Sequence, residues 1–146
     1  MESTKPTKIS EIKRQWYLID AKDQILGRTA TQIALLLMGK SKPYFVKNLD
    51  CGDYVVVINA KDIKVTGKKE SDKMYYRHSG YPGGFKSESY NKLKARRPGE
   101  TIKRAVLGMV PQTKLRDRML KRLYVFESHE HPYQNKFKSE DTKAKS

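Results

Sequence analysis

Apolar residues near the start of the chain follow two different periods, which predict two strands with a helix between them. The segment WYLID, residues 16–20, is aromatic and β-branched and favours a strand. The run YVVVI, residues 54–58, contains no polar residue, so both of its faces should be buried, as in a central parallel strand. This order predicts a βαβ unit with a right-handed crossover. The residues between the two strands recur at helical spacing ahead of Gly39, and they are Leu26, Ala30, Ile33, Ala34 and Leu37.

The pattern after residue 60 predicts shorter elements. Pro98 stands where a first helical residue would, and an apolar stripe follows it until Gly108 and Pro111 end the helix. Thr113 can cap a further short helix, whose inward-facing residues would be Leu115, Met119, Leu120 and Leu123. The other expected elements are a short strand and turn at 63–69, a strand at 73–79, one or two helical turns at 88–95 and a last strand at 123–126.

Length and composition indicate one domain with a modest core. The chain has 146 residues, of which 37% are hydrophobic, against a usual share of about 45–50%. We expect a flexible N-terminal extension at 1–15, a single α/β domain at 16–126, and a C-terminal tail at 127–146 that is mobile at its end.

Membrane insertion and secretion are not expected. The longest apolar run, Ile33 to Met38, is far shorter than the ~20 residues that a membrane-spanning helix needs. The N-terminus carries no apolar core like that of a secretory signal. A single cysteine, Cys51, cannot form an internal disulfide, so a reducing cytoplasm is the default expectation.

The chain is strongly basic, and its charge is unevenly placed. The net charge is +15, and residues 83–126 carry 12 basic and 3 acidic side chains, which is more than half of that net charge. A merely solvated helix face would mix both signs through i,i+4 pairs, whereas KLKARRPGETIKR (92–104) and KLRDRMLKRL (114–123) are almost uniformly basic. We therefore expect a face that binds a polyanion, with phosphate contacts favoured over a solvated surface.

The glycine-rich segment HSGYPGGFKS, residues 78–87, allows three interpretations. It approaches the phosphate loop G-x-x-x-x-G-K-[ST], but Phe85 stands where a glycine is required, so a nucleotide-dependent or RNA-modifying α/β enzyme using residues 80–87 is the minor alternative. Glycine and Pro82 also suit a plain tight turn. A turn that lets the backbone approach an RNA strand is favoured by the flanking residues Arg77, His78, Tyr81 and Lys86.

Other chemistry-bearing residues give weaker signals. The segment MYYRH, residues 74–78, alternates its side chains between two faces, and both core packing and base stacking remain open for them. His129 and His131 form an H-x-H pair with no cysteine cluster nearby, so no metal site is expected. No catalytic pair can be read from the spacing of the aspartates, and no catalytic residue is expected.

Five blocks of the sequence form a distinctive series, and they are WYLIDAKDQILGRTATQIALLLMGK, DCGDYVVVINAKDIKVTGKK, YYRHSGYPGGFK, ARRPGETIKRAVLGMVP and LKRLYVF. Together these blocks resemble a known family, ribosomal protein thirteen of the large subunit, bacterial type. The resemblance covers about residues 14 to 135 and implies a three-layer α/β/α fold with a mostly parallel four-stranded sheet, plus basic extensions. The chain departs from the family pattern at Arg116, where glycine is usual, and at Asp117, where arginine is usual.

This resemblance implies a non-catalytic structural constituent of the large ribosomal subunit in the cytoplasm, without a cofactor or small-molecule substrate. Its implied partners are large-subunit (23S-type) rRNA, bound directly and early in assembly, neighbouring large-subunit proteins and, for some members, their own mRNA. Together with the basic and aromatic pattern, it leads us to expect RNA contacts from Lys40, Lys42, Lys68, Lys69, Tyr76, Arg77, His78, Tyr81, Gly83, Gly84, Lys86, Arg96, Arg97, Lys103, Arg104, Lys114, Arg118, Lys121 and Arg122.

Overall fold

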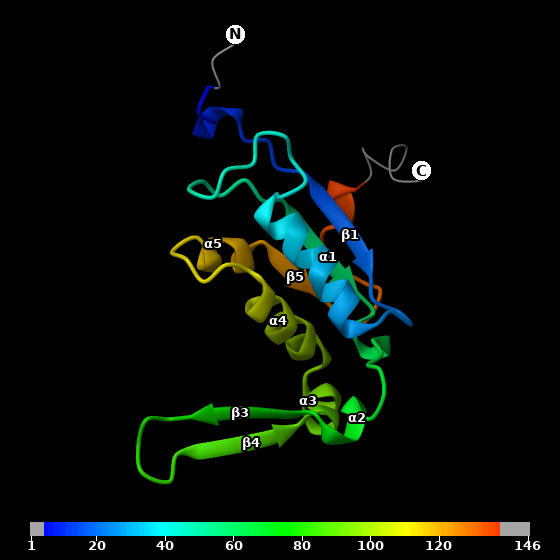
Figure 1. Ribbon diagram of the computed structural model, residues 1–146. Coiled ribbons are helices and arrows are strands. Elements are labelled where there is room, and N and C mark those ends of the chain that lie inside the picture. Colours follow the sequence, from blue (N-terminus) through cyan, green and yellow to red (C-terminus); the bar gives the residue numbers. More distant parts are fainter. Residues whose placement is uncertain (1–4, 138–146) are drawn as a thin grey trace.

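The computed structural model describes residues 5–137, which form a mixed α/β structure with two separate sheets (Figure 1). The main sheet has three parallel strands in the order β1-β2-β5. Its register runs from Trp16 opposite Tyr54 to Asp20 opposite Ile58. The predicted strand–helix–strand unit is confirmed, with β1 (Trp16–Asp20), α1 (Leu26–Met38) and β2 (Tyr54–Ile58), and β5 (Leu123–Val125) completes the sheet.

The helix α1 covers one face of the main sheet, as its apolar spacing predicts. Its buried side chains include all five residues of the predicted apolar stripe, and they pack with Val55 and Val57 of β2 in the core. Gly39 ends the helix with φ at 76°, and its N–H donates a hydrogen bond to the Leu35 carbonyl. The helix α4 (Pro98–Met109) lies beside α1 and adds Ile102 to the same core (Figure 1).

The opposite face of the main sheet is covered by aromatic side chains. Trp16 stacks on Tyr54, with ring centroids 4.4 Å apart, and on Tyr133 from the C-terminal segment, with centroids 5.2 Å apart. Val56 points to this face and is fully buried. The prediction that both faces of β2 are buried is therefore confirmed. Within residues 5–137, the cover on the second face consists of aromatic side chains. The expected three-layer arrangement is not confirmed.

A fourth strand in the main sheet is likewise not confirmed. The segment at 63–69, expected to be a short strand, contributes only one parallel bridge in the described part of the chain, between Ile25 and Lys64. This bridge prolongs the parallel pairing of β1 with β2, because Ile25 follows β1 along the chain and Lys64 follows β2. After it, Gly67 turns the chain with φ at 61°, and the short helix α2 (Lys69–Asp72) replaces further extended structure.

The second sheet is an antiparallel hairpin of β3 (Met74–His78) and β4 (Phe85–Ser89), which extends away from the main sheet (Figure 1). The strand β3 was predicted, whereas β4 occupies residues expected to lie in the glycine loop and in a helical turn. The helix α3 (Tyr90–Arg96) follows β4 directly, with the Ser89 side chain accepting a hydrogen bond from the Lys92 N–H.

The remaining elements agree with the apolar pattern in kind. The helix α4 has Pro98 in its first turn, as predicted. The helix α5 (Arg116–Lys121) follows, and its buried residue is Met119. Within residues 5–137, no helix combines the length and the apolar character needed to cross a bilayer. The expectation of a mobile chain end concerns residues 138–146, which lie outside the described residues.

Replacing Tyr90 with phenylalanine should reduce the loss of stability at alkaline pH. Burial in the core, with smaller contributions from Tyr75 and Glu70, raises the pKa of Tyr90 to about 12. An unfolded tyrosine ionises near pH 10, so above that pH the unfolded state releases a proton that the folded state retains. The contribution of Tyr90 to stability is therefore fully present below pH ~10, and the free energy of unfolding should fall by about 2 kcal/mol by pH ~11.5. Urea unfolding below pH ~10 and at pH ~11.5 measures this loss, and an equal loss in Tyr90→Phe would contradict its assignment to Tyr90.

Candidate nucleic-acid interface

The β3–β4 hairpin separates its side chains into two faces with different chemistry. The register pairs Tyr75 with Glu88 and Arg77 with Lys86, and these four residues share one face because side chains alternate along a strand. This first face is charged, and we call it the basic face. The second face, which we call the aromatic face, carries Met74, Tyr76, His78, Phe85, Ser87 and Ser89.

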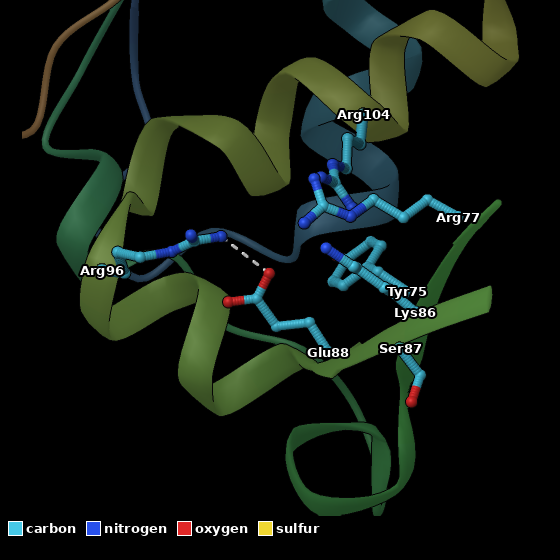
Figure 2. Close-up of a pocket in the computed structure, with 7 residues that line it drawn as sticks. All are labelled: Tyr75, Arg77, Lys86, Ser87, Glu88, Arg96 and Arg104. Carbon is cyan, nitrogen blue, oxygen red and sulfur yellow. Dashed lines mark hydrogen bonds and ion pairs between the residues drawn. The ribbon is translucent and has the colours of Figure 1, made fainter. Parts of the chain in front are cut away.

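Four basic side chains from separate elements line a pocket of about 310 Å³ beside the basic face (Figure 2). Arg77 and Lys86 come from the hairpin, Arg96 from α3 and Arg104 from α4. Figure 2 shows the side-chain nitrogens of Arg77, Lys86 and Arg104 gathered on the same side of the hairpin. We call this set of four residues the basic pocket.

The floor of the basic pocket is Tyr75. The Arg104 guanidinium lies over its ring, with the carbon of the guanidinium 5.0 Å from the ring centroid, a geometry that fixes the cation by attraction to the aromatic face. Burial raises the pKa of the Tyr75 hydroxyl, while the charge of Arg104 opposes that rise. Tyr75 is therefore neutral at physiological pH, and it provides an aromatic ring for Arg104 to lie on rather than a negative charge.

The positive charge of the basic pocket is only partly neutralised by the protein. Arg96 pairs with Glu88 at 2.7 Å between Nη2 and Oε2, and Arg104 pairs with Glu100 at 3.3 Å between Nε and Oε1. Among residues 5–137, no carboxylate lies within ion-pair distance of Arg77 or Lys86. Cations held together in this way repel one another, and an anion placed between them relieves that repulsion.

The tip of the hairpin is a tight turn that the glycines make possible. Gly80 and Gly83 adopt positive φ angles of 84° and 72°, which L side chains rarely adopt. Gly84 donates a hydrogen bond to the Tyr81 carbonyl at 2.9 Å, and a Cβ on Gly84 would lie 1.9 Å from the Ser79 Oγ. The turn itself therefore accounts for these three glycines, without any need for a closely approaching ligand.

The same geometry argues against the enzyme alternative. In a nucleotide-binding loop, the lysine and the serine stand at the start of a helix whose N–H groups face the phosphates. Here Lys86 and Ser87 lie inside the strand β4, and the next helix begins only at Tyr90. The glycine loop is a hairpin turn and not a phosphate loop, so the alternative of an enzyme using residues 80–87 is not supported.

Changing Gly83 to alanine should loosen the hairpin by about 1 kcal/mol, because a left-handed conformation is unfavourable for alanine. The matched control is Gly108→Ala in α4, where φ is not positive and a Cβ would meet nothing within 4 Å. That control should stabilise its helix by about 0.5–1 kcal/mol. Amide hydrogen exchange of the β3 and β4 backbones measures the hairpin effect. Unchanged exchange in Gly83→Ala would show that the turn tolerates a side chain.

Most of the other residues expected to contact RNA are exposed, but they do not line the basic pocket. Tyr81 is 75% exposed at the hairpin tip, and His78 is exposed with its Nδ1 accepting a hydrogen bond from the Gly80 N–H at 2.9 Å. Of the basic residues that were expected to contact RNA, those exposed outside the hairpin and the basic pocket are Lys40, Lys68, Lys69, Arg97, Lys103, Lys114, Arg118 and Lys121.

Two basic residues expected at the interface are instead engaged inside the protein. Arg122 was expected among the RNA contacts, which would require an exposed side chain, but the residue is only 7% exposed. Its guanidinium pairs with both carboxylate oxygens of Asp50, and its Nη2 donates to the Leu37 carbonyl. Lys42 is also largely covered, with its Nζ 2.7 Å from the Asp53 carboxylate. Neither side chain is available to a nucleic acid without breaking these contacts.

Sequence reasoning found the members of the basic pocket but not their convergence. It missed Tyr75 as the floor, Glu88 as the partner of Arg96 and Phe85 as a neighbour of Tyr76. The local signal for β4 was weak, because Lys86 and Glu88 alternate with Ser87 and Ser89 while Phe85 falls on the serine side.

Comparison with known proteins assigns the chain to a family. The family model described as Ribosomal protein L13 matches residues 14–132. A protein of Geobacter sulfurreducens named "Large ribosomal subunit protein uL13" is 48% identical over 134 residues, which cover 92% of this chain and 94% of that protein. Proteins with the same name from Dehalococcoides mccartyi and Roseiflexus castenholzii are 51% and 52% identical, and cover 90% and 86% of this chain and 92% and 86% of their own lengths.

Proposed function

Since the chain belongs to the ribosomal protein L13 family, whose members are structural and not enzymatic, we propose that it is a structural constituent of the large ribosomal subunit that binds large-subunit rRNA directly. In this role it resides with the ribosome in the cytoplasm, and its partners are rRNA and neighbouring ribosomal proteins. The observation that supports direct RNA binding is the basic pocket, where four cations converge beside a projecting hairpin.

The basic pocket suits the phosphates of an RNA backbone. Arginine presents its N–H groups as a planar fork that matches phosphate oxygens, and Arg104 is held in place by the ring of Tyr75. Lys86 adds a point charge from the hairpin. Binding would release counterions from the RNA, so affinity would fall with rising salt. Such contacts fix the position of the protein on the RNA, and the shape of the folded RNA supplies specificity.

The remaining exposed cations extend this interface over several elements. Arg97 immediately precedes α4 and Lys103 lies on it, so both are close in sequence to Arg96 and Arg104 of the basic pocket. Lys114 precedes α5, whereas Arg118 and Lys121 lie on that helix. A protein with separated basic surfaces can contact more than one RNA segment, which is the property required of a scaffold that joins in early assembly. We place this RNA-binding unit at residues 16–126. Binding to its own mRNA, which the family resemblance implies for some members, would use the same phosphate contacts.

Sucrose-gradient fractionation of a cell lysate tests the proposed function. We expect the protein to sediment with the large subunit and to remain with it in moderate salt, since many phosphate contacts act together. Addition of EDTA, which separates ribosomal subunits, should leave the protein in the large-subunit fraction. Recovery of the protein in the soluble fractions at the top of the gradient would overturn the proposal.

A further inference from the structure

The aromatic face of the hairpin carries two large rings in solvent. Tyr76 is 64% exposed and Phe85 is 60% exposed, although aromatic side chains of this size gain free energy by leaving water. The two rings are close to parallel, with centroids 5.6 Å apart and planes inclined by 21°. They form a diagonal pair across β3 and β4 and therefore present one continuous surface, which we call the aromatic platform.

We propose that the aromatic platform stacks on an unpaired base of the large-subunit rRNA, so that the hairpin is held between two RNA segments. This inference rests on the proposed function, and it adds a second mode of contact and a residue, Phe85, to the proposed interface. The basic face would contact the backbone of one segment, and the aromatic face would stack on a base of the other. The hairpin extends away from the main sheet (Figure 1), and both of its faces carry exposed side chains, Arg77 and Lys86 on one face and Tyr76 and Phe85 on the other.

The surroundings of the aromatic platform favour a nucleic-acid base over an apolar protein surface. The other members of this face are Met74, His78, Ser87 and Ser89, and none of them is acidic. The opposite face of the same two strands carries Arg77 and Lys86, which raise the local concentration of a polyanion. Aromatic rings exposed beside cations are the usual platform for unpaired bases, because each base offers a π face of matching size.

A second aromatic cluster in the protein shows the contrast. Trp16, Tyr54 and Tyr124 also lie on one face of a sheet, but Tyr133 from the C-terminal segment packs against Trp16 and Tyr124 at 5.2 Å and 4.6 Å between ring centroids. The protein covers those rings itself. Within residues 5–137, the ring contact of Tyr76 is with Phe85 alone. The aromatic platform is thus a pair of stacked rings that residues 5–137 leave open to a partner.

Stacking and phosphate contact respond differently to salt, which separates the two halves of the interface. Phosphate contacts set the slope of log K against log salt, whereas stacking adds affinity without releasing counterions. The test variant is Tyr76→Leu/Phe85→Leu, which retains apolar volume but removes both rings. A second variant, Tyr76→Phe/Phe85→Tyr, retains both rings. The matched control is Leu107→Ala/Met109→Ala, which removes exposed apolar side chains from α4.

The experiment measures equilibrium binding of the full chain to large-subunit rRNA transcribed in vitro, over a series of salt concentrations. We expect Tyr76→Leu/Phe85→Leu to bind roughly 10- to 100-fold more weakly with an unchanged salt slope, because loss of a stacked base has effects of this size. The ring-retaining variant and the α4 control should bind within about 2-fold of wild type. Thermal unfolding of each variant should match wild type, since all the replaced side chains are exposed.

Two results would overturn the inference. Wild-type affinity in Tyr76→Leu/Phe85→Leu would mean that no base of the rRNA stacks on the aromatic platform. A reduced salt slope would mean that the rings act only by holding the cations in position. Neither result touches the proposed function, which would fail in this experiment if the wild-type protein did not bind the rRNA.

Discussion

Replacing Arg122 with alanine should lower the free energy of unfolding by about 3–5 kcal/mol, because it removes the main partner of the buried Asp50 carboxylate and leaves Arg14, at 3.7 Å, as its remaining cation. Asp50 is 8% exposed, and both of its oxygens accept hydrogen bonds from Arg122. The same guanidinium donates from Nε to the Asp53 carbonyl at 3.2 Å. One side chain therefore joins the start of β5, the end of α1 and the loop before β2.

The pKa of Asp50 gives this prediction a pH dependence. Burial on its own would raise that pKa, but the hydrogen bond and charge of Arg122, with the charge of Arg14, outweigh burial and lower the pKa below the usual 3.8. A lowered pKa stabilises the fold above the unfolded value and ceases to do so as the pH falls through the folded value. The difference between wild type and Arg122→Ala should thus be complete near neutral pH and should shrink below pH ~4.

Urea unfolding at pH ~7 measures the effect of Arg122→Ala. The matched control is Arg118→Ala, which removes an exposed arginine from α5, the helix that ends just before Arg122, and should change stability by less than about 0.5 kcal/mol. Asp50→Ala should also be strongly destabilising, and the double variant should lose less than the sum of the two, since the partners act as one unit. A loss below about 1 kcal/mol in Arg122→Ala would contradict a structural role for the buried pair.

Neutralising the basic pocket should produce the largest loss of RNA affinity. The variant changes Arg77, Lys86, Arg96 and Arg104 to glutamine together. If each contacts a phosphate, the slope of log K against log salt should flatten by about 3, and binding in ~0.1 M salt should weaken roughly 100- to 1,000-fold. The affinity of the full chain for large-subunit rRNA, measured across a salt series, gives both numbers.

The control for this variant removes the same charge from another surface. Lys22, Arg28, Lys61 and Lys64 are all exposed and lie outside the expected interface. Changing these four to glutamine should alter the slope by less than about 1, because they act only through the general field of the protein. Equal losses in both quadruple variants would show that net charge, and not the basic pocket, governs binding.

The βαβ unit could be predicted because its sequence pattern depends on burial in the main core. The apolar residues of α1 at helical spacing are all buried, and the uninterrupted run of β2 has Val55, Val56 and Val57 fully buried. In both cases the period of the pattern reflects which faces meet the core. The sequence could not show what covers each face, so aromatic rings stand where the family resemblance implied a further layer.

The formation of β4 and the burial of Arg122 depend on contacts between distant parts of the chain, which no local sequence pattern contains. The residues of β4 are mostly polar because the strand pairs only with β3 and is largely exposed, so the apolar alternation that marks a strand is weak there. Arg122 is separated from Asp50 by 72 positions in the sequence. A basic residue in a basic helix predicts an exposed side chain, and only the fold brings its carboxylate partner to it.

The convergence of the basic pocket was unpredictable for the same reason. Arg77, Lys86, Arg96 and Arg104 each belong to a basic stretch of sequence, together with cations that lie elsewhere on the surface. Their selection requires the position of α3 after β4 and the contact of Arg104 with Tyr75. Sequence composition therefore predicts a polyanionic ligand, and that remains a prediction, whereas the placement of the candidate site required the structure.

Ultraviolet crosslinking of purified large subunits, followed by mass spectrometry of RNA-linked peptides, tests direct rRNA contact at the hairpin most directly. We expect crosslinks from rRNA to peptides that contain residues 75–88, with attachment at the aromatic residues and at Lys86. Crosslinks confined to peptides from other parts of the chain, with the hairpin peptides recovered unmodified, would contradict this expectation.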